Sequence, residues 1–390
     1  MLCTTLTVPR DYGNPGTDPS QTFQIAVIKD PATGDASAYQ GPILMNPGGP
    51  GASGFDMVAH GGHAKNAYHA AYDLVGFDPR GIARSHPVQC LTDQEADAIV
   101  FQDDRPQTDA ERKAFAASVG MIGAHCAAND PDVYRWMGTD NVARDMDVLR
   151  AALGRPDLTY LGLSYGSRLG QTYAQLFPDN VRRMVIDGIV PADTTYAEQL
   201  RDQVVSFQAT FEEYLRTCAT RDTCPLSHDP AEAARQFMGM FATLDQSPAV
   251  VPGMGTLHDY MLRDAIIPLL YADPEGWGLI DVAIKPVLAG EYKEALDVYL
   301  TGTGRRPDGT YADHAHGLVA FDAVTCADNP NDLTIDQVAA LADEADRTSP
   351  LLGRVAPGTC SPAPGGRSTW GSRGAPSRTS RSCARGDHPA

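Results

Sequence analysis

The sequence predicts an α/β fold in which a mostly parallel sheet is covered by helices on both faces. Three observations indicate this class: short apolar strands in the first half, helical periodicity between the later ones, and a change to mostly helical sequence from about residue 196 to residue 321. Alternation of strand and helix is typical of parallel sheets, because the crossover helices lie on the faces of the sheet. With 390 residues the chain exceeds what one hydrophobic core usually supports, so a second, smaller domain is expected.

Four short strands are expected before residue 80. They are expected over residues 5–8, 21–29, 42–46 and 73–77. In the second of them, Phe23, Ile25 and Val27 occupy alternate positions, which is the period of a half-buried strand. The third strand runs into a glycine-rich segment, and the fourth ends at Asp78-Pro79-Arg80-Gly81.

The middle of the chain alternates between helix and strand. The apolar residues that share one helical face are Val142, Met146, Leu149 and Leu153. Asp140 or Asn141 is the expected N-cap of this helix, and Gly154 follows its end. A strand over Leu158–Leu163, a helix over residues 166–177 and a strand over residues 183–189 come next. This order predicts parallel strands in one sheet.

The second half of the chain is predominantly helical up to a final segment of different composition. Helical segments are expected over residues 200–215 and 231–244. We interpret residues 1–195 as the N-terminal part of the sheet domain, 196–325 as a helical cap inserted into it, and 326–360 as the segment that returns to it. Residues 361–390 contain no Leu, Ile, Val, Met or Phe and are expected to be a disordered tail or the product of a shifted reading frame. Either way, the C-terminal strands of the core are expected to be missing.

The composition argues against two classes of partner. The net charge of −18 and the pI near 4.8 argue against nucleic acid, because phosphate binding needs clustered Lys and Arg. The apolar runs fall far short of the roughly 20 residues that span a bilayer. We therefore expect a soluble protein that binds neither nucleic acid nor a membrane.

The eight cysteines lack the C-x-x-C spacing typical of zinc sites and redox dithiols, so no metal is expected. The expected disulfides join sequential cysteines: Cys90 with Cys126, Cys218 with Cys224, and Cys326 with Cys360. Such bonds form in an oxidising compartment, and the alternative is a set of buried thiols in a cytosolic protein. Because no basic and apolar leader follows Met1, the protein is expected either to be cytosolic or to start upstream of this residue.

The strongest chemical signal is Gly162-Leu163-Ser164-Tyr165-Gly166, a G-x-S-x-G pattern between an apolar strand and a helix. A sharp turn there holds the serine in a strained conformation, and the small residues beside it let helix and strand approach. The helix N-terminus directs backbone N–H groups toward developing negative charge. We expect Ser164 to be a nucleophile and the N–H of Tyr165 to be an oxyanion donor. The alternative is an ordinary turn with a serine cap.

A second oxyanion donor is expected in the loop after the third strand. Residues 46–54, N-P-G-G-P-G-A-S-G, occupy that place, and their glycines permit backbone conformations that point N–H groups inward. The N–H of Gly49 is the expected donor. Taken alone, the segment would be a generic loop rich in glycine and proline.

Three segments together resemble one known family. They are Gly48-Gly49-Pro50-Gly51, residues 76–85 with the sequence G-F-D-P-R-G-I-A-R-S, and residues 162–166. They look like the prolyl iminopeptidase and tripeptidyl aminopeptidase family of serine exopeptidases. Residues 3–12, C-T-T-L-T-V-P-R-D-Y, and 323–328, A-V-T-C-A-D, are similar to its secreted bacterial tripeptidyl aminopeptidase branch.

The resemblance extends from the N-terminus to Cys360. It implies an α/β-hydrolase core with an inserted helical cap, and a secreted or cell-wall-associated enzyme that needs no cofactor. It also implies a peptide substrate with a free N-terminus, from which short peptides or single residues are released through an acyl-enzyme.

The chain departs from that family after the cap. The resemblance implies a triad acid on a strand ending in a G-x-x-D-like segment and a histidine on a later G-H-like loop, and residues 361–390 contain neither. His314 and His316 are expected to be solvated or to cap a helix, and His388 lies in the tail, so no catalytic histidine is assigned. Asp187 ends the strand after the nucleophile strand and could approach the site, but capping of the loop 188–193 is the favoured interpretation.

Three functional hypotheses follow from these residues. The first is a serine aminopeptidase that uses Ser164. The second is an esterase-type hydrolase, because the same turn and oxyanion donors accept esters. The third is a truncated, inactive hydrolase that lacks the triad acid and base.

Overall fold

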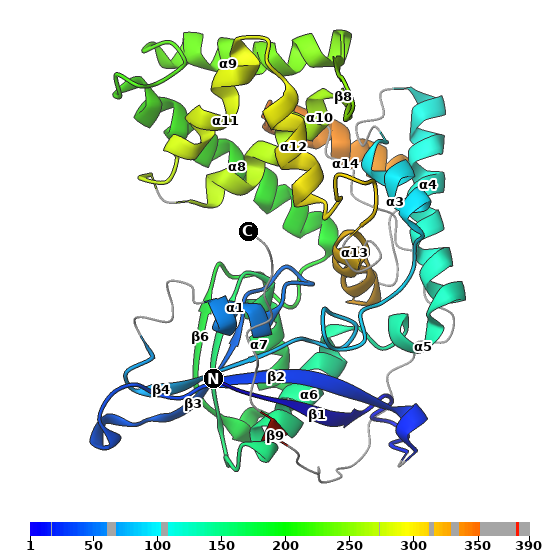
Figure 1. The fold of residues 1–390 in the computed structure, drawn as a ribbon, viewed down its shortest axis with the longest axis vertical. Helices are drawn as coiled ribbons and strands as arrows, with labels where there is room; N and C mark the ends of the chain where they lie inside the picture. The colour runs from blue at the N-terminus through cyan, green and yellow to red at the C-terminus, as the bar shows by residue number, and fades with distance from the viewer. Residues whose placement is uncertain are drawn as a thin grey trace.

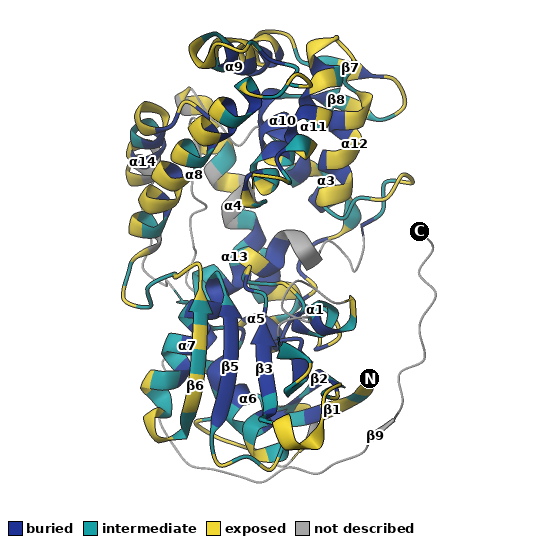
Figure 2. Ribbon diagram, turned by 90° about the vertical axis from the view of Figure 1, so that its left-hand side faces the viewer, coloured by how far each residue is buried: buried dark blue, intermediate teal, exposed yellow. Residues whose placement is uncertain are grey.

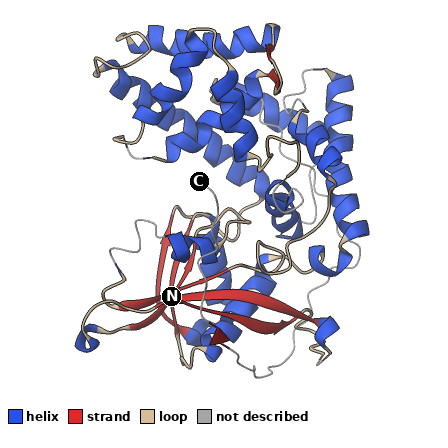
Figure 3. Ribbon diagram, in the orientation of Figure 1, coloured by secondary structure: helices blue, strands red, loops and turns tan. Residues whose placement is uncertain are grey.

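The computed structural model describes residues 1–16, 18–60, 68–102, 108–272, 274–311, 316–328, 335–351 and 380–381. These residues form a layer built on a seven-stranded sheet and a layer of helices above it (Figure 1). Figure 3 shows that all of the long strands belong to the sheet layer.

The order of strands in the sheet is β6-β5-β3-β4-β2-β1-β9. Their bounds are β1 (Leu2–Pro9), β2 (Thr22–Asp30), β3 (Gly41–Asn46), β4 (Tyr72–Phe77), β5 (Leu158–Leu163), β6 (Val181–Asp187) and β9 (Ser380–Arg381). The strands β4, β3, β5 and β6 are parallel to one another. At the β4 side of this set, β2 pairs antiparallel with β4, β1 pairs antiparallel with β2, and β9 pairs antiparallel with β1. The predicted α/β fold with a mostly parallel sheet is confirmed.

The two faces of the sheet are covered by different helices. On one face, α6 (Thr139–Ala152) and α7 (Tyr165–Leu176) pack together and share a hydrophobic core with β2, β4 and β5. On the other face, Val58 of α1 (Gly54–His60) packs with Ile28, Ile43 and Leu161. Figure 2 shows β3 and β5 buried between these helices.

Two expectations about the core require correction. The helix α6 begins after Gly138, which offers no side chain, so neither Asp140 nor Asn141 is its N-cap. The strand expected over residues 183–189 runs from Val181 to Asp187, and it lies at the edge of the described sheet, where Val185 is 51% exposed. Of residues 361–390 the structure describes Ser380 and Arg381, which pair with Thr4 and Cys3 as the short edge strand β9, and the expectation for the tail stays a prediction.

The helical layer is formed mainly by segments after residue 195. The helices there are α8 (Tyr196–Ala219), α9 (Pro230–Gln246), α10 (Asp259–Ile266), α11 (Gly278–Leu288), α12 (Lys293–Gly302), α13 (His316–Asp328) and α14 (Ile335–Thr348). The hairpin of β7 (Ala249–Val251) and β8 (Gly255–Leu257) and the 3-10 helix η4 (Ile267–Tyr271) lie between them. The helical segments expected over residues 200–215 and 231–244 fall within α8 and α9.

Segments from the first half of the chain also contact this layer. They include α3 (Asp93–Val100) and α4 (Asp109–Asn129), which is followed by α5 (Pro131–Tyr134). The Tyr299 hydroxyl of α12 donates to the Val100 carbonyl at 2.9 Å, and Arg305 pairs with Asp97 at 2.8 Å. The domain boundary at residue 195 stays a prediction. Short 3-10 helices complete the described elements: η1 (Pro19–Gln21), η2 (Ala36–Ala38) and η3 (Pro178–Asn180).

Two of the three expected disulfides are present. They join Cys90 to Cys126 and Cys218 to Cys224. Cys326 is disulfide-bonded as well, but Cys360 lies outside the described residues, so their pairing stays a prediction. Within the described ranges, no helix is both long and apolar enough to cross a membrane.

Candidate active site

Ser164 lies at the sharp turn between β5 and α7, as the sequence predicts. Its backbone is at φ 53° and ψ −122°, a conformation that residues with a Cβ rarely adopt. The Ser164 N–H donates to the Asp187 carbonyl at 2.8 Å, and the Ser164 carbonyl accepts from the N–H and the hydroxyl of Ser167 at 2.8 and 2.6 Å. These bonds hold the strained turn from both sides while the Ser164 side chain stays half-buried.

The strand and helix beside the turn approach closely because the flanking residues have no side chain. A Cβ added to Gly162 would lie 2.3 Å from the carbonyl oxygen of Gly166. A Cβ added to Gly166 would lie 2.8 Å from the carbonyl oxygen of Asn46. The two glycines therefore allow β5, α7 and the end of β3 to meet at one point, which is the steric role the motif predicts.

The glycine-rich loop after β3 packs directly against this turn. The Gly48 N–H donates to the buried Asn46 side chain at 3.0 Å, and a Cβ on Gly48 would lie 2.4 Å from the Leu163 carbonyl oxygen and 3.1 Å from the Tyr165 nitrogen. Gly49 follows with φ 104° and a cis bond to Pro50. The fold thus brings together the two segments that the sequence predicts to form an oxyanion hole.

The N–H groups of Gly49 and Tyr165 are available to a ligand. Neither donates a hydrogen bond to any group in the described part of the chain. Gly49 is exposed, and Tyr165 is the first residue of α7, where the backbone N–H groups lack helical partners and carry partial positive charge. Both N–H groups therefore stay candidates for the oxyanion donors that the sequence predicts beside Ser164.

A buried carboxylate anchors the far end of the glycine-rich loop. Asp78, fully buried after β4, accepts from the hydroxyl of Ser53, from the N–H of Phe55 at 3.3 Å, and from the N–H and guanidinium of Arg84 at 3.2 and 3.1 Å. Arg84 also pairs with Asp56 at 2.7 Å. Sequence reasoning gave Asp78 no role, although its position directly after a buried strand was a usable signal.

Asp187 contacts the site only through its main chain. Its carbonyl accepts from Ser164, but its carboxylate is exposed and makes no hydrogen bond with the described residues. The expected capping of the loop 188–193 by this side chain is therefore not seen. Among the described side chains no histidine is hydrogen-bonded to Ser164, while His314 and His388 lie outside the described residues. His316 begins α13, and its side chain is not described.

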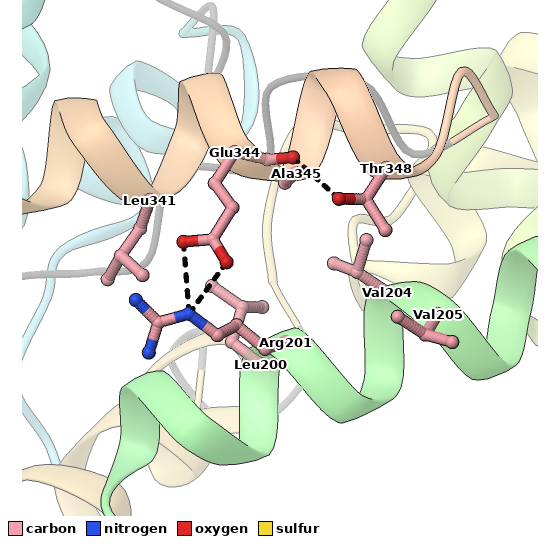
Figure 4. A pocket seen from close by; sticks show the side chains of 8 residues that line it. All are labelled: Leu200, Arg201, Val204, Val205, Leu341, Glu344, Ala345 and Thr348. Carbon is pink, nitrogen blue, oxygen red and sulfur yellow. Dashed lines mark hydrogen bonds and ion pairs between the residues drawn. The ribbon is translucent and has the colours of Figure 1, made fainter.

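A pocket elsewhere does not belong to this site. It lies between α8 and α14, where its apolar lining includes Leu200, Val204 and Leu341, and Arg201 donates to Glu344 at 2.9 and 3.0 Å (Figure 4). None of its lining residues comes from the serine turn or the glycine-rich loop.

The fold and the site define a class of protein. A strained serine at a strand-to-helix turn, facing a glycine-rich loop from the neighbouring parallel strand, is the nucleophile arrangement typical of α/β hydrolases. The α/β hydrolase fold family matches residues 41–265, and the chain belongs to this family of enzymes.

Curated relatives refine this assignment. The serine protease Hip1 of Mycobacterium tuberculosis is 33% identical over 366 residues, which cover 90% of this chain and 68% of that protein. The tripeptidyl aminopeptidase of Streptomyces coelicolor is 37% identical over 255 residues, covering 64% of this chain and 46% of the relative. Carboxylesterase B of Mycobacterium tuberculosis is 35% identical over 342 residues, covering 84% of this chain and 62% of the relative. The resemblance predicted from the motifs is confirmed, and the chain spans 46% to 68% of the length of these relatives.

Proposed function

We propose that the protein is a serine hydrolase that releases short peptides or single residues from the free N-termini of peptides, with Ser164 as its nucleophile. The observation that carries this proposal is the strained Ser164 turn packed against Gly48, beside the N–H groups of Gly49 and Tyr165, which donate to no group among the described residues. The relatives named as a serine protease and a tripeptidyl aminopeptidase support the choice of a peptide substrate.

In the proposed reaction the Ser164 hydroxyl oxygen attacks the carbonyl carbon of the scissile bond. The carbonyl oxygen gains the negative charge, and the N–H groups of Gly49 and Tyr165 donate hydrogen bonds to it. Collapse of the tetrahedral intermediate expels the leaving amine and leaves an acyl group on Ser164, which water then removes. The serine proton must pass to a general base and on to the leaving amine, and we assign that base to no described residue.

An esterase is the second candidate, because one relative is named carboxylesterase B and the same oxyanion hole stabilises the intermediate of ester hydrolysis. Three substrates separate the two candidates: a tripeptidyl 4-nitroanilide, its N-acetylated form, and 4-nitrophenyl butyrate. The aminopeptidase predicts fast release from the free peptide, at least about tenfold slower release from the acetylated peptide, and no release by Ser164→Ala. Faster turnover of the butyrate than of either peptide would favour the esterase, and release by Ser164→Ala would exclude both.

We also propose that the protein acts outside the cytosol. The Cys90–Cys126 and Cys218–Cys224 disulfides favour an oxidising compartment. The test is fractionation of the native host under thiol-blocking conditions: the protein should be found in the medium or cell wall with these four cysteines unmodified. Recovery in the cytosol with alkylated cysteines would contradict the proposal.

A further inference from the structure

The helix α13 (His316–Asp328) contacts the glycine-rich loop directly and reaches Tyr165 through Thr139, although it lies far from both segments in the sequence. Near its N-terminus, the Cβ of Ala320 lies 3.1 Å from the place that a Cβ on Gly51 would occupy. At its C-terminus, Asp328 reaches the start of α6. Figure 1 shows α13 between the helical layer and the sheet layer.

The connection is a chain of three side chains. The carboxylate of Asp328 accepts from the Thr139 N–H at 2.8 Å and from the Thr139 hydroxyl at 2.5 Å. The Tyr165 hydroxyl lies 2.5 Å from the same Thr139 oxygen. Because a threonine hydroxyl has one proton and donates it to the carboxylate, Tyr165 must be the donor to Thr139. The order of donation is therefore fixed as Tyr165 to Thr139 to Asp328.

The carboxylate of Asp328 takes the place of a local N-cap side chain for α6. Gly138 precedes α6 and has no side chain to accept the first helical N–H, so Asp328 accepts it from a distant part of the chain. Burial raises the pKa of Asp328, while its bonds to Thr139 and the guanidinium of Arg168 at 3.9 Å oppose that rise. Its position at a helix N-terminus favours negative charge there.

Tyr165 links the oxyanion hole to Thr139, because its backbone and its side chain serve the two ends of this link. Its backbone N–H is a candidate oxyanion donor, and its buried side chain ends in the hydroxyl that donates to Thr139. We propose that Asp328 is a positioning residue that fixes the oxyanion hole through Thr139 and Tyr165, so that α13 must be docked for the hole to have its reactive geometry. This inference rests on the proposed function of Ser164.

The test uses variants of the whole chain that each remove one bond. Thr139→Val removes the hydroxyl but keeps the N–H that Asp328 accepts, and Tyr165→Phe removes only the terminal hydroxyl. Thr139→Ser keeps the hydroxyl and serves as the conservative rescue. Leu244→Ala, in the buried face of α9, is the matched control for a general loss of stability.

Two readouts are compared for each variant. The first is kcat and KM for whichever of the three substrates the wild-type protein turns over fastest. We expect kcat to fall about tenfold or more with KM unchanged in Thr139→Val and Tyr165→Phe, and to be retained in Thr139→Ser and Leu244→Ala. The second is hydrogen exchange of the amides in residues 164–170, which should accelerate in the same two variants and in neither control.

The outcomes separate this inference from the proposed function. Wild-type turnover with no loss in Thr139→Val and Tyr165→Phe overturns the positioning role and leaves Ser164 hydrolysis intact. Unchanged exchange in residues 164–170 of those variants overturns it as well. If the wild-type protein turns over none of the substrates, the proposed function fails, and selective acceleration of exchange still supports the link from Asp328 to Tyr165.

Discussion

The α-carbon of Gly48 faces the carbonyl oxygen of Leu163 so closely that a Cβ on Gly48 would lie 2.4 Å from it. Gly48→Ala should therefore strain the contact between the glycine-rich loop and the serine turn, in addition to the strain of placing alanine at a φ of 95°. Gly154 is the matched control, because it has a φ of 71° with nothing within 4 Å of an added Cβ. We expect Gly154→Ala to lower the free energy of unfolding, measured in urea, by about 1 kcal/mol. Gly48→Ala should lower it by at least about 2 kcal/mol more. Equal costs would show that the loop does not pack as described.

The strain at Ser164 predicts an unusual order of stability among its variants. Both Ser164→Ala and Ser164→Gly remove the hydroxyl, but only glycine relieves the positive φ of 53°. We expect Ser164→Gly to be the more stable by about 1 kcal/mol, despite its larger loss of backbone entropy on folding. Urea denaturation of the two variants measures the difference, and a more stable Ser164→Ala would contradict the strained turn.

The buried pair of Arg80 and Asp145 should be sensitive to loss of one partner. The guanidinium donates to both carboxylate oxygens at 2.8 and 2.5 Å, and both side chains are almost fully buried. Asp145→Ala leaves a buried positive charge and should lower the free energy of unfolding by about 3 to 5 kcal/mol. Glu344→Ala, which breaks the exposed pair with Arg201, should cost less than about 1 kcal/mol. Chemical denaturation compares the two variants. Similar losses of unfolding free energy in both would contradict the larger contribution of the buried pair.

The carboxyl of Asp322 in α13 should make stability depend on pH. Burial raises its pKa from 3.8 to about 6. Burial, and after it the charge of Asp322, raises the pKa of the neighbouring Tyr134. Because the folded state holds the proton of Asp322 more tightly than the unfolded state, stability falls as pH rises from about 4 to about 6 and stays lower above that window. Asp322→Asn should match the wild-type protein near pH 4 and be about 2 to 3 kcal/mol more stable at pH 8. Thermal melts of both proteins across this pH range test the prediction. If Asp322→Asn differed from the wild-type protein by the same amount at pH 4 and pH 8, the raised pKa of Asp322 would be wrong.

The sequence predicts those features of the fold and the site that local patterns of residues determine. The period-2 pattern around Phe23, Ile25 and Val27 predicts β2, and the G-x-S-x-G segment between an apolar strand and a helix predicts the turn at Ser164. Both depend on residues a few positions apart, so the chain itself carries the signal.

The features that the sequence does not predict depend on residues that are distant in the chain. The N-cap of α6 was expected at Asp140 or Asn141, but the N–H of Thr139 is bound by Asp328, 189 residues later. N-cap preferences consider only the residues next to the helix, so they cannot predict a capping group that is distant in the chain. The exposure of β6 was missed for a related reason, because an apolar composition does not show whether a strand has a neighbour on both sides.

Covalent labelling of the whole chain with a fluorophosphonate, followed by peptide mapping, tests the central claim most directly. If the N–H groups of Gly49 and Tyr165 are oxyanion donors to the strained Ser164, as proposed, the protein should form one adduct, on Ser164, and Gly48→Ala should label much more slowly. An adduct on another serine, or the absence of any adduct on Ser164 in the folded wild-type protein, would contradict the account.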